Sequence, residues 1–104
     1  MPGLMISTSP VLANPSGGIV VHGDVQISGT NGNLQILQNS SNAIIHWDSF
    51  SIASGELTRF FQPSSSSAVL NRVTGGDPSS IYGALQANGN VFVINPSGIL
   101  VGPG

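Results

Sequence analysis

Turn-forming segments interrupt this sequence about every ten residues, and this spacing limits any regular element between them to a short length. Each segment combines Gly with Asn, Asp, Pro or Ser, residues that adopt or stabilise tight turns. The segments lie at 14–18, 29–32, 54–55, 74–78, 88–89 and 95–98. The sequence between them shows no apolar spacing of three and four residues, so no helix is predicted.

Short apolar runs between the turns predict β-strands. Val, Ile, Leu and Phe make up 31 of the 104 residues, enough for a modest core in a chain where 46 residues are Gly, Pro, Ser or Asn. The runs alternate apolar with polar residues or are rich in β-branched residues. They predict strands at 18–22, 25–28, 33–38, 43–47, 49–52, 57–62, 68–73, 81–86, 90–94 and 99–101. We therefore expect an all-β domain.

The chain carries very little charge, which excludes several classes of protein. It contains 2 Lys and Arg residues, 4 Asp and Glu residues and no Cys. Two cations are too few to neutralise a nucleic-acid backbone, so nucleic acid is excluded as a partner. The longest apolar runs span four residues, far below the roughly 20 that a transmembrane helix needs. Without Cys there is no disulfide and no thiolate metal site.

Low charge also bears on the β-architecture. Regular short strands are compatible with a sandwich, a barrel or a solenoid of stacked coils. Sandwich surfaces carry many Lys and Glu side chains, which discourage edge-to-edge pairing. In a parallel β-helix, equivalent positions of successive coils lie about 4.8 Å apart, so stacked like charges repel, whereas Ser, Thr and Asn form ladders. The composition therefore favours the solenoid.

Six sequence blocks carry a resemblance to a known family. They lie at 14–18 (NPSGG), 43–52 (AIIHWDSFSI), 61–64 (FQPS), 69–73 (VLNRV), 75–79 (GGDPS) and 88–99 (NGNVFVINPSGI). With these blocks in this order and spacing, the sequence resembles the N-terminal secretion domain of filamentous-haemagglutinin-type adhesins. This domain is also called the two-partner secretion domain or the haemagglutination activity domain.

The resemblance implies a fold, an export route and a partner. The implied fold is a right-handed parallel β-helix with an N-terminal cap. The implied route is export by a signal peptide through the periplasm, to the outside or the cell surface of a Gram-negative bacterium. The implied partner is the periplasmic part of an outer-membrane transporter of the two-partner secretion type. Adhesion, haemolysis or toxicity, and any contact with host glycans, would reside mostly beyond this domain, whose own role is secretion targeting without a cofactor.

Residues 1–13 differ from the rest of the chain. Val11, Leu12 and Ala13 fit a signal-peptidase site that follows an apolar stretch, although prolines interrupt the stretch and no basic residue precedes it. We expect residues 1–13 to be a leader or the remnant of a signal peptide, and residues 14–104 to be the N-terminal part of a two-partner secretion domain. Family members extend further past the block at 95–99, which predicts that this chain is truncated at its C-terminus.

One candidate for transporter recognition is a turn, formed by Asn95, Pro96, Ser97, Gly98 and Ile99. Pro presets φ, Asn bonds the backbone two residues on, and Gly accepts the left-handed geometry. The family usually has Asn in place of Ser97. Because a Ser hydroxyl can also bond locally, we expect the turn to form.

A second candidate for transporter recognition is the strand motif Leu70, Asn71, Arg72 and Val73. Strand alternation is expected to place Leu70 or Val73 in the core. It leaves Arg72 on the outside, where its long side chain can pair or extend along the surface.

Residues suited to catalysis or metal binding form no set that specifies a site. His22 with Asp24 and His46 with Asp48 are two His-x-Asp pairs, but nothing in the sequence joins them into a three-ligand zinc site. The Ser residues lie in turn-like tracts and lack a nucleophile elbow. The acids are dispersed, whereas glycoside hydrolases need converging carboxylates. We therefore predict neither an enzyme nor a metal site.

An alternative function is an autonomous carbohydrate- or cell-surface-binding adhesin module. That function predicts an exposed Trp47 or Tyr82 as a platform for a sugar ring. Trp47 and Phe50 alternate with polar residues in a strand pattern, which instead favours a core or cap role. The Ser tract at 64–67 is expected to form a loop projecting between strands.

Overall fold

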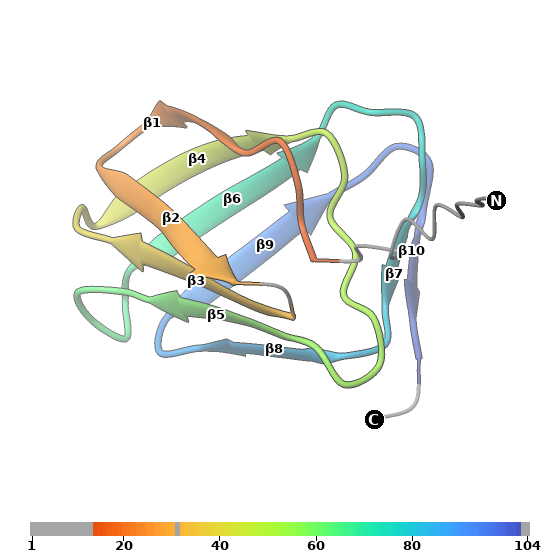
Figure 1. The fold of residues 1–104 in the computed structure, drawn as a ribbon. Helices are drawn as coiled ribbons and strands as arrows, with labels where there is room; N and C mark the ends of the chain where they lie inside the picture. Colours follow the sequence, from red (N-terminus) through yellow and green to blue (C-terminus); the bar gives the residue numbers. More distant parts are fainter. Residues whose placement is uncertain (1–13, 31, 103–104) are drawn as a thin grey trace, which may run out of the picture.

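The computed structural model describes residues 14–30 and 32–102, which form ten β-strands and contain no helix (Figure 1). No helix in this part of the chain is therefore long and apolar enough to cross a membrane. The expected leader at 1–13 lies outside the described residues. The strands are β1 (Ile19–His22), β2 (Val25–Thr30), β3 (Asn33–Gln38), β4 (Asn42–Trp47), β5 (Leu57–Phe61), β6 (Ala68–Val73), β7 (Ser79–Ile81), β8 (Ala84–Ala87), β9 (Asn90–Ile94) and β10 (Ile99–Val101).

The strands form three sheets, which confirms the prediction of an all-β fold. One sheet has the order β1-β4-β6-β9, a second has the order β2-β3-β5-β8, and β7 pairs with β10. Pairing is antiparallel where β1 meets β4 and where β2 meets β3. The remaining strand pairs are parallel. The sheets are therefore mixed, with the antiparallel strands at one end of each four-stranded sheet.

The parallel strands stack in register, which places equivalent residues of successive strands side by side. In one sheet Asn33 lies opposite Leu57, which lies opposite Ala84. In the other, Asn42 lies opposite Ala68, which lies opposite Asn90. Because side chains alternate along a strand, one side chain in two points into the space between the sheets. The buried cluster there consists of Ile36, Ala43, Ile45, Trp47, Phe50, Phe60, Val69 and Val73.

The aromatic pair at the end of β4 lies inside this core. Trp47 and Phe50 are both buried, and their rings meet edge to face with centroids 5.6 Å apart. This geometry is favoured by the opposite charges of a ring edge and a ring face. The prediction of a core role for Trp47 and Phe50 is confirmed, and stacking of a sugar on Trp47 is excluded.

Two predicted strands differ in the structure. Residues 49–52 form isolated bridges only, from Ser49 to Ser16 and from Ile52 to Ile81. The predicted strand at 81–86 is divided between β7 and β8 by a corner at Gly83. The carbonyl of Ile52 accepts hydrogen bonds from the amides of both Tyr82 and Gly83, which turns the chain there. A Cβ at Gly83 would lie 2.3 Å from the Ala53 carbonyl oxygen, so only Gly fits this corner.

Candidate recognition site

The candidate turn at 95–98 connects β9 to β10 and has the predicted geometry. The amide of Gly98 donates to the Asn95 carbonyl at 3.0 Å, and the amide of Ser97 donates to Asn95 Oδ1 at 2.9 Å. Gly98 has a φ of 109°, a value that residues with a Cβ rarely adopt. The turn is therefore held by the Asn side chain and by the conformational freedom of Gly, as expected from the sequence.

The turn at 95–98 is also bonded to the loop at 74–78, which follows β6. Asn95 Nδ2 donates to the carbonyl of Asp77 and to Ser79 Oγ, each at 2.9 Å. Ser97 Oγ donates to the Gly76 carbonyl at 3.0 Å. Ser97, which occupies a position where the family usually has Asn, thus fastens one loop onto the other. The sequence did not reveal this contact, because it depends on which strands are neighbours.

The candidate motif Leu70 to Val73 occupies most of β6. Asn71 and Val73 are buried, Leu70 is half-buried on the opposite side of the strand, and Arg72 is exposed. Of the two alternatives for the core residue, Val73 is the one that points inward. Burial of Asn71 was not expected. The spacing Val69, Asn71, Val73 is the sequence signal for it, since all three lie on one side of a strand.

The structure brings the two candidate motifs to one corner of the molecule. Arg72 lies opposite Ile94 in the β6–β9 ladder, immediately before the loops that follow each strand. In Figure 1 the chain leaves β6 and β9 on the same side and continues into the neighbouring strands β7 and β10. We name residues 70–79 and 94–99 the motif corner.

The outer surfaces of the two four-stranded sheets differ in character. The outward side chains of β1, β4, β6 and β9, here named the β6 face, include Ile19, Ile44, His46, Leu70, Arg72, Phe92 and Ile94. The outward side chains of β2, β3, β5 and β8, here named the β5 face, include Gln26, Ser28, Gln35, Leu37, Arg59, Phe61 and Gln86. The β6 face therefore exposes more large apolar side chains than the β5 face does.

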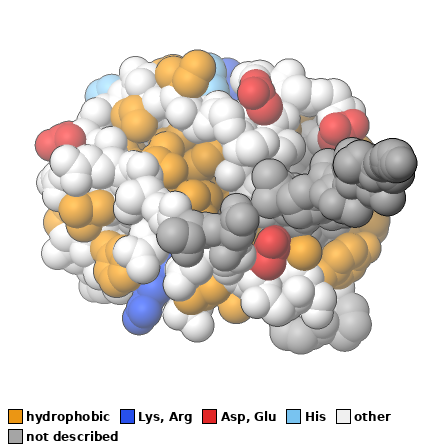
Figure 2. Space-filling model, in the orientation of Figure 1, with side chains coloured by type: hydrophobic (Ala, Val, Ile, Leu, Met, Phe, Trp, Pro, Cys, Tyr) orange, Lys and Arg blue, Asp and Glu red, His pale blue; other side chains and the backbone are white. Residues whose placement is uncertain are grey.

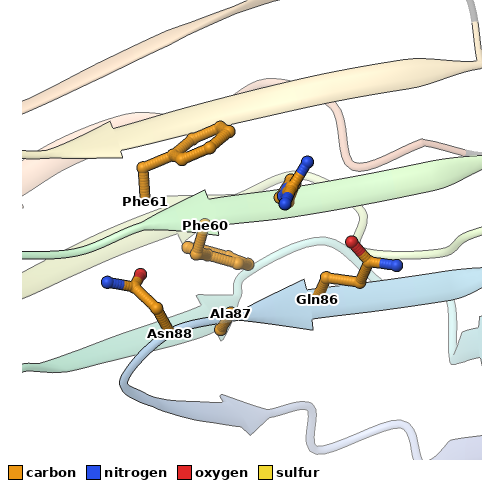
Figure 3. Close-up of a pocket in the computed structure, with 6 residues that line it drawn as sticks. Phe60, Phe61, Gln86, Ala87 and Asn88 are labelled. Carbon is orange, nitrogen blue, oxygen red and sulfur yellow. The ribbon is translucent and has the colours of Figure 1, made fainter. Parts of the chain in front are cut away.

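The β5 face contains a hollow of about 330 Å³. It is lined by Arg59, Phe60, Phe61, Gln86, Ala87 and Asn88. In Figure 3, Phe60 and Phe61 project to opposite sides of β5 while Gln86 extends from the neighbouring β8. The guanidinium of Arg59 lies 5.1 Å from the centre of the Phe61 ring, a cation–π contact. Arg59, the cation of the β5 face, therefore contacts an aromatic ring of the same chain.

The charged side chains are distributed unevenly. Arg59, Arg72, His22 and His46 all lie in strands, whereas the four acids Asp24, Asp48, Glu56 and Asp77 all lie outside them. On the side shown in Figure 2 the red carboxylate groups lie apart from one another and form no cluster. Within 14–30 and 32–102, no three His, Asp or Glu side chains come together in a way that would hold a metal ion. The two His-x-Asp pairs are separate, with His22 opposite Ile44 and His46 opposite Ile19.

The chain belongs to the class of all-β domains with preformed surface loops. An all-β scaffold holds two loops against each other through side-chain amides and hydroxyls, and these groups bond backbone atoms. Such an arrangement fixes the relative position of the two loops.

Comparison with known proteins identifies the family. A family model described as the TPS secretion domain matches residues 10–104, and the chain belongs to this family. The family is a secretion domain of proteins exported by Gram-negative bacteria. The expectation drawn from the six sequence blocks is confirmed at this level.

Similar proteins come from Haemophilus influenzae. A heme/hemopexin-binding protein of strain ATCC 51907 is 39% identical over 90 residues, which cover 86% of this chain and 10% of that protein. A second H. influenzae protein of that name is 40% identical over 85 residues, which cover 81% of this chain and 9% of that protein. The crystal structure of the HMW1 secretion domain matches with a TM-score of 0.80 at 39% identity, covering 86% of this chain and 24% of that one. The chain spans about a tenth of the length of the curated relatives it matches.

Proposed function

We propose that this chain targets a larger exoprotein for secretion, because the periplasmic domains of an outer-membrane transporter recognise it. The observation that carries the proposal is the match of residues 10–104 to the TPS secretion domain. The proposed route leads through the periplasm to the cell surface or the medium. Residues 1–13 would be a leader or the remnant of a signal peptide, and residues 14–104 the N-terminal part of the secretion domain.

For the fold we propose a right-handed parallel β-helix with an N-terminal cap. Three parallel ladders support it, running through β3-β5-β8, β4-β6-β9 and β7-β10. The antiparallel strands β1 and β2 would form the cap, since each pairs with the first parallel strand of its sheet. The similarity to the HMW1 secretion domain supports the same arrangement.

The motif corner is the proposed recognition element for the transporter. Its loops at 74–78 and 95–98 are joined by hydrogen bonds from Asn95 and Ser97, so they are presented as one surface. A preorganised surface loses little conformational entropy on binding, which favours affinity. Arg72 adds one exposed cation beside these loops.

The test is calorimetry of the purified chain with the periplasmic domains of the transporter from the same bacterium. Binding with a Kd of about 1 μM or tighter is expected, as for a specific protein pair. Asn95→Ala should weaken binding, because it removes the hydrogen bonds from the Asn95 side chain to Asp77 and Ser79 and loosens the contact between the two loops. Gln35→Ala, an exposed residue of β3 on the β5 face, is the matched control and should bind like the unmodified chain. Absence of binding both by this chain and by the chain extended with its native downstream sequence would contradict the proposed function.

A second candidate function is carbohydrate binding, and it depends on Tyr82. The Tyr82 ring is 42% exposed and, with Glu56 and Gln86, lines a hollow of about 440 Å³. An exposed aromatic ring beside amide and carboxylate groups suits a sugar ring. A glycan array probed with the chain and with Tyr82→Ala tests this function. Binding that requires Tyr82, without any binding to the transporter domains, would favour the adhesin module.

A further inference from the structure

The β6 face exposes apolar side chains in two rows that cross the sheet. One row contains His22, Ile44, Leu70 and Phe92, and the adjacent row contains Ile19, His46, Arg72 and Ile94. Phe92 is 57% exposed, Ile94 45% and Ile19 66%. Contiguous apolar surface of this kind is uncommon on monomeric proteins and marks sites of interaction.

The parallel registration of the strands explains why these side chains form one surface. Leu70 lies opposite Phe92, and Arg72 lies opposite Ile94, so the rows run at right angles to strands β4, β6 and β9. Neighbouring strands lie about 4.8 Å apart, which brings the side chains of a row into contact range. A large aromatic ring with aliphatic neighbours is the kind of group that dominates binding energy at protein interfaces.

The strands of the β6 face contain one Arg, Arg72, together with His22 and His46, and no Asp or Glu. The matching cation of the β5 face, Arg59, lies over the Phe61 ring of its own strand. Opposite charges steer partners together and exclude wrong ones, so a partner for the β6 face would carry carboxylates around an apolar centre.

We propose that the β6 face is the surface on which the periplasmic domain of the transporter docks, with Ile44, Leu70 and Phe92 packing against it and Arg72 pairing with a carboxylate of that domain. The proposal rests on the proposed secretion function and adds the location of the contact. Leu70 and Arg72 belong to both the β6 face and the motif corner, so the two surfaces are continuous. The partner surface is apolar and bordered by Asp or Glu residues.

The chain provides its own control for this proposal. Each outer face holds one Arg and one partly exposed Phe, namely Arg72 and Phe92 on the β6 face and Arg59 and Phe61 on the β5 face. The test compares Phe92→Ser and Arg72→Glu with Phe61→Ser and Arg59→Glu, by calorimetry against the periplasmic domains of the transporter. Circular dichroism and thermal unfolding of all four variants verify that each is folded.

The expected result is a loss of affinity of about tenfold or more for Phe92→Ser and for Arg72→Glu, with little change for the β5-face variants. Arg72→Glu should also lower the association rate constant at low salt, and most of the salt dependence of that rate constant should be lost. If the unmodified chain binds and both β6-face variants bind with the same affinity, this inference would be overturned, and the secretion function would still stand. Absence of any binding would overturn both.

A second copy of the chain is the competing occupant of the β6 face. Sedimentation velocity of the unmodified chain at increasing concentration distinguishes it from the transporter. A monomer that binds the transporter domains through Phe92 supports the proposal. A dimer that Phe92→Ser dissociates, with unchanged affinity for the transporter domains, would contradict it.

Discussion

The indole nitrogen of Trp47 donates a hydrogen bond of 2.9 Å to Oδ1 of Asn71, and both side chains are buried. Asn71 Nδ2 in turn donates to the carbonyl of Phe92 at 3.2 Å. One amide thus joins β4, β6 and β9 through the interior. A buried polar side chain is tolerated when its donors and acceptors are satisfied, and Asn71 meets this condition.

Asn71→Leu is expected to lower the free energy of unfolding by about 1–3 kcal/mol, because it leaves the buried Trp47 donor without an acceptor. Urea denaturation measures the change. Trp47→Phe removes the donor, so in that background Asn71→Leu should cost less, and the double-mutant cycle gives the coupling energy. Arg72→Gln, one residue along the strand and exposed, is the control. Equal costs of Asn71→Leu in both backgrounds would show that this hydrogen bond contributes little.

A second buried amide contact joins β3 to the end of β5. Gln62 Nε2 donates to Gln38 Oε1 at 3.2 Å, while Gln38 Nε2 donates to the carbonyls of Ser40, Ser41 and Ala68. Gln62 Oε1 is buried and lacks a hydrogen-bond partner within the described residues. The two glutamines therefore lie side by side, but all side-chain polar atoms of Gln38 have a partner, whereas Gln62 Oε1 has none in the part of the chain that the structure describes.

Gln38→Leu should destabilise the chain more than Gln62→Leu does. The first change leaves carbonyl acceptors without their donor, at a cost of about 1–3 kcal/mol. The second also removes an oxygen that has no partner, which offsets part of the loss. Thermal unfolding of the two variants under identical conditions provides the comparison. If Gln62→Leu proved the more destabilising, the unpartnered oxygen would not be a liability.

Much of the fold could be predicted because its strands are short and separated by turns with recognisable residues. The bounds predicted at 33–38, 68–73, 90–94 and 99–101 are those of β3, β6, β9 and β10. Local patterns failed where a tertiary contact decides the conformation. The corner at Gly83 depends on the carbonyl of Ile52, which lies in a distant part of the sequence.

The candidate site could be predicted only in parts. The turn at 95–98 follows from residues adjacent in sequence, and its geometry is confirmed. Its attachment to the loop at 74–78 depends on the β6–β9 register, which no local pattern encodes. The same holds for the β6 face, because Leu70 and Phe92 become neighbours only through that register.

Asn95→Ala is expected to destabilise the motif corner more than Ser97→Ala. Asn95 makes three hydrogen bonds, to the amide of Ser97, the carbonyl of Asp77 and Ser79 Oγ. The Ser97 hydroxyl makes one, to the Gly76 carbonyl. At about 0.5–1.5 kcal/mol for each bond, Ser97→Ala should cost roughly a third of what Asn95→Ala costs. Hydrogen exchange of the amides in 74–79 and 95–99 measures local opening directly, and equal exchange in both variants would contradict this ranking.

Three glycines allow the effect of backbone conformation to be measured separately from the effect of steric room for a Cβ. A Cβ at Gly98, Gly55 or Gly76 would meet nothing within 4 Å, but φ is 109° at Gly98 and 86° at Gly55, whereas Gly76 has no positive φ. We expect Gly98→Ala and Gly55→Ala each to lower the free energy of unfolding by about 1–2 kcal/mol, because a Cβ is strained in this region. Gly76→Ala should be neutral or slightly stabilising, because it restricts the unfolded chain without strain. Urea denaturation of the three variants decides between these outcomes. Similar destabilisation by Gly76→Ala would show that loop packing, and not the sign of φ, controls the tolerance of these positions to substitution.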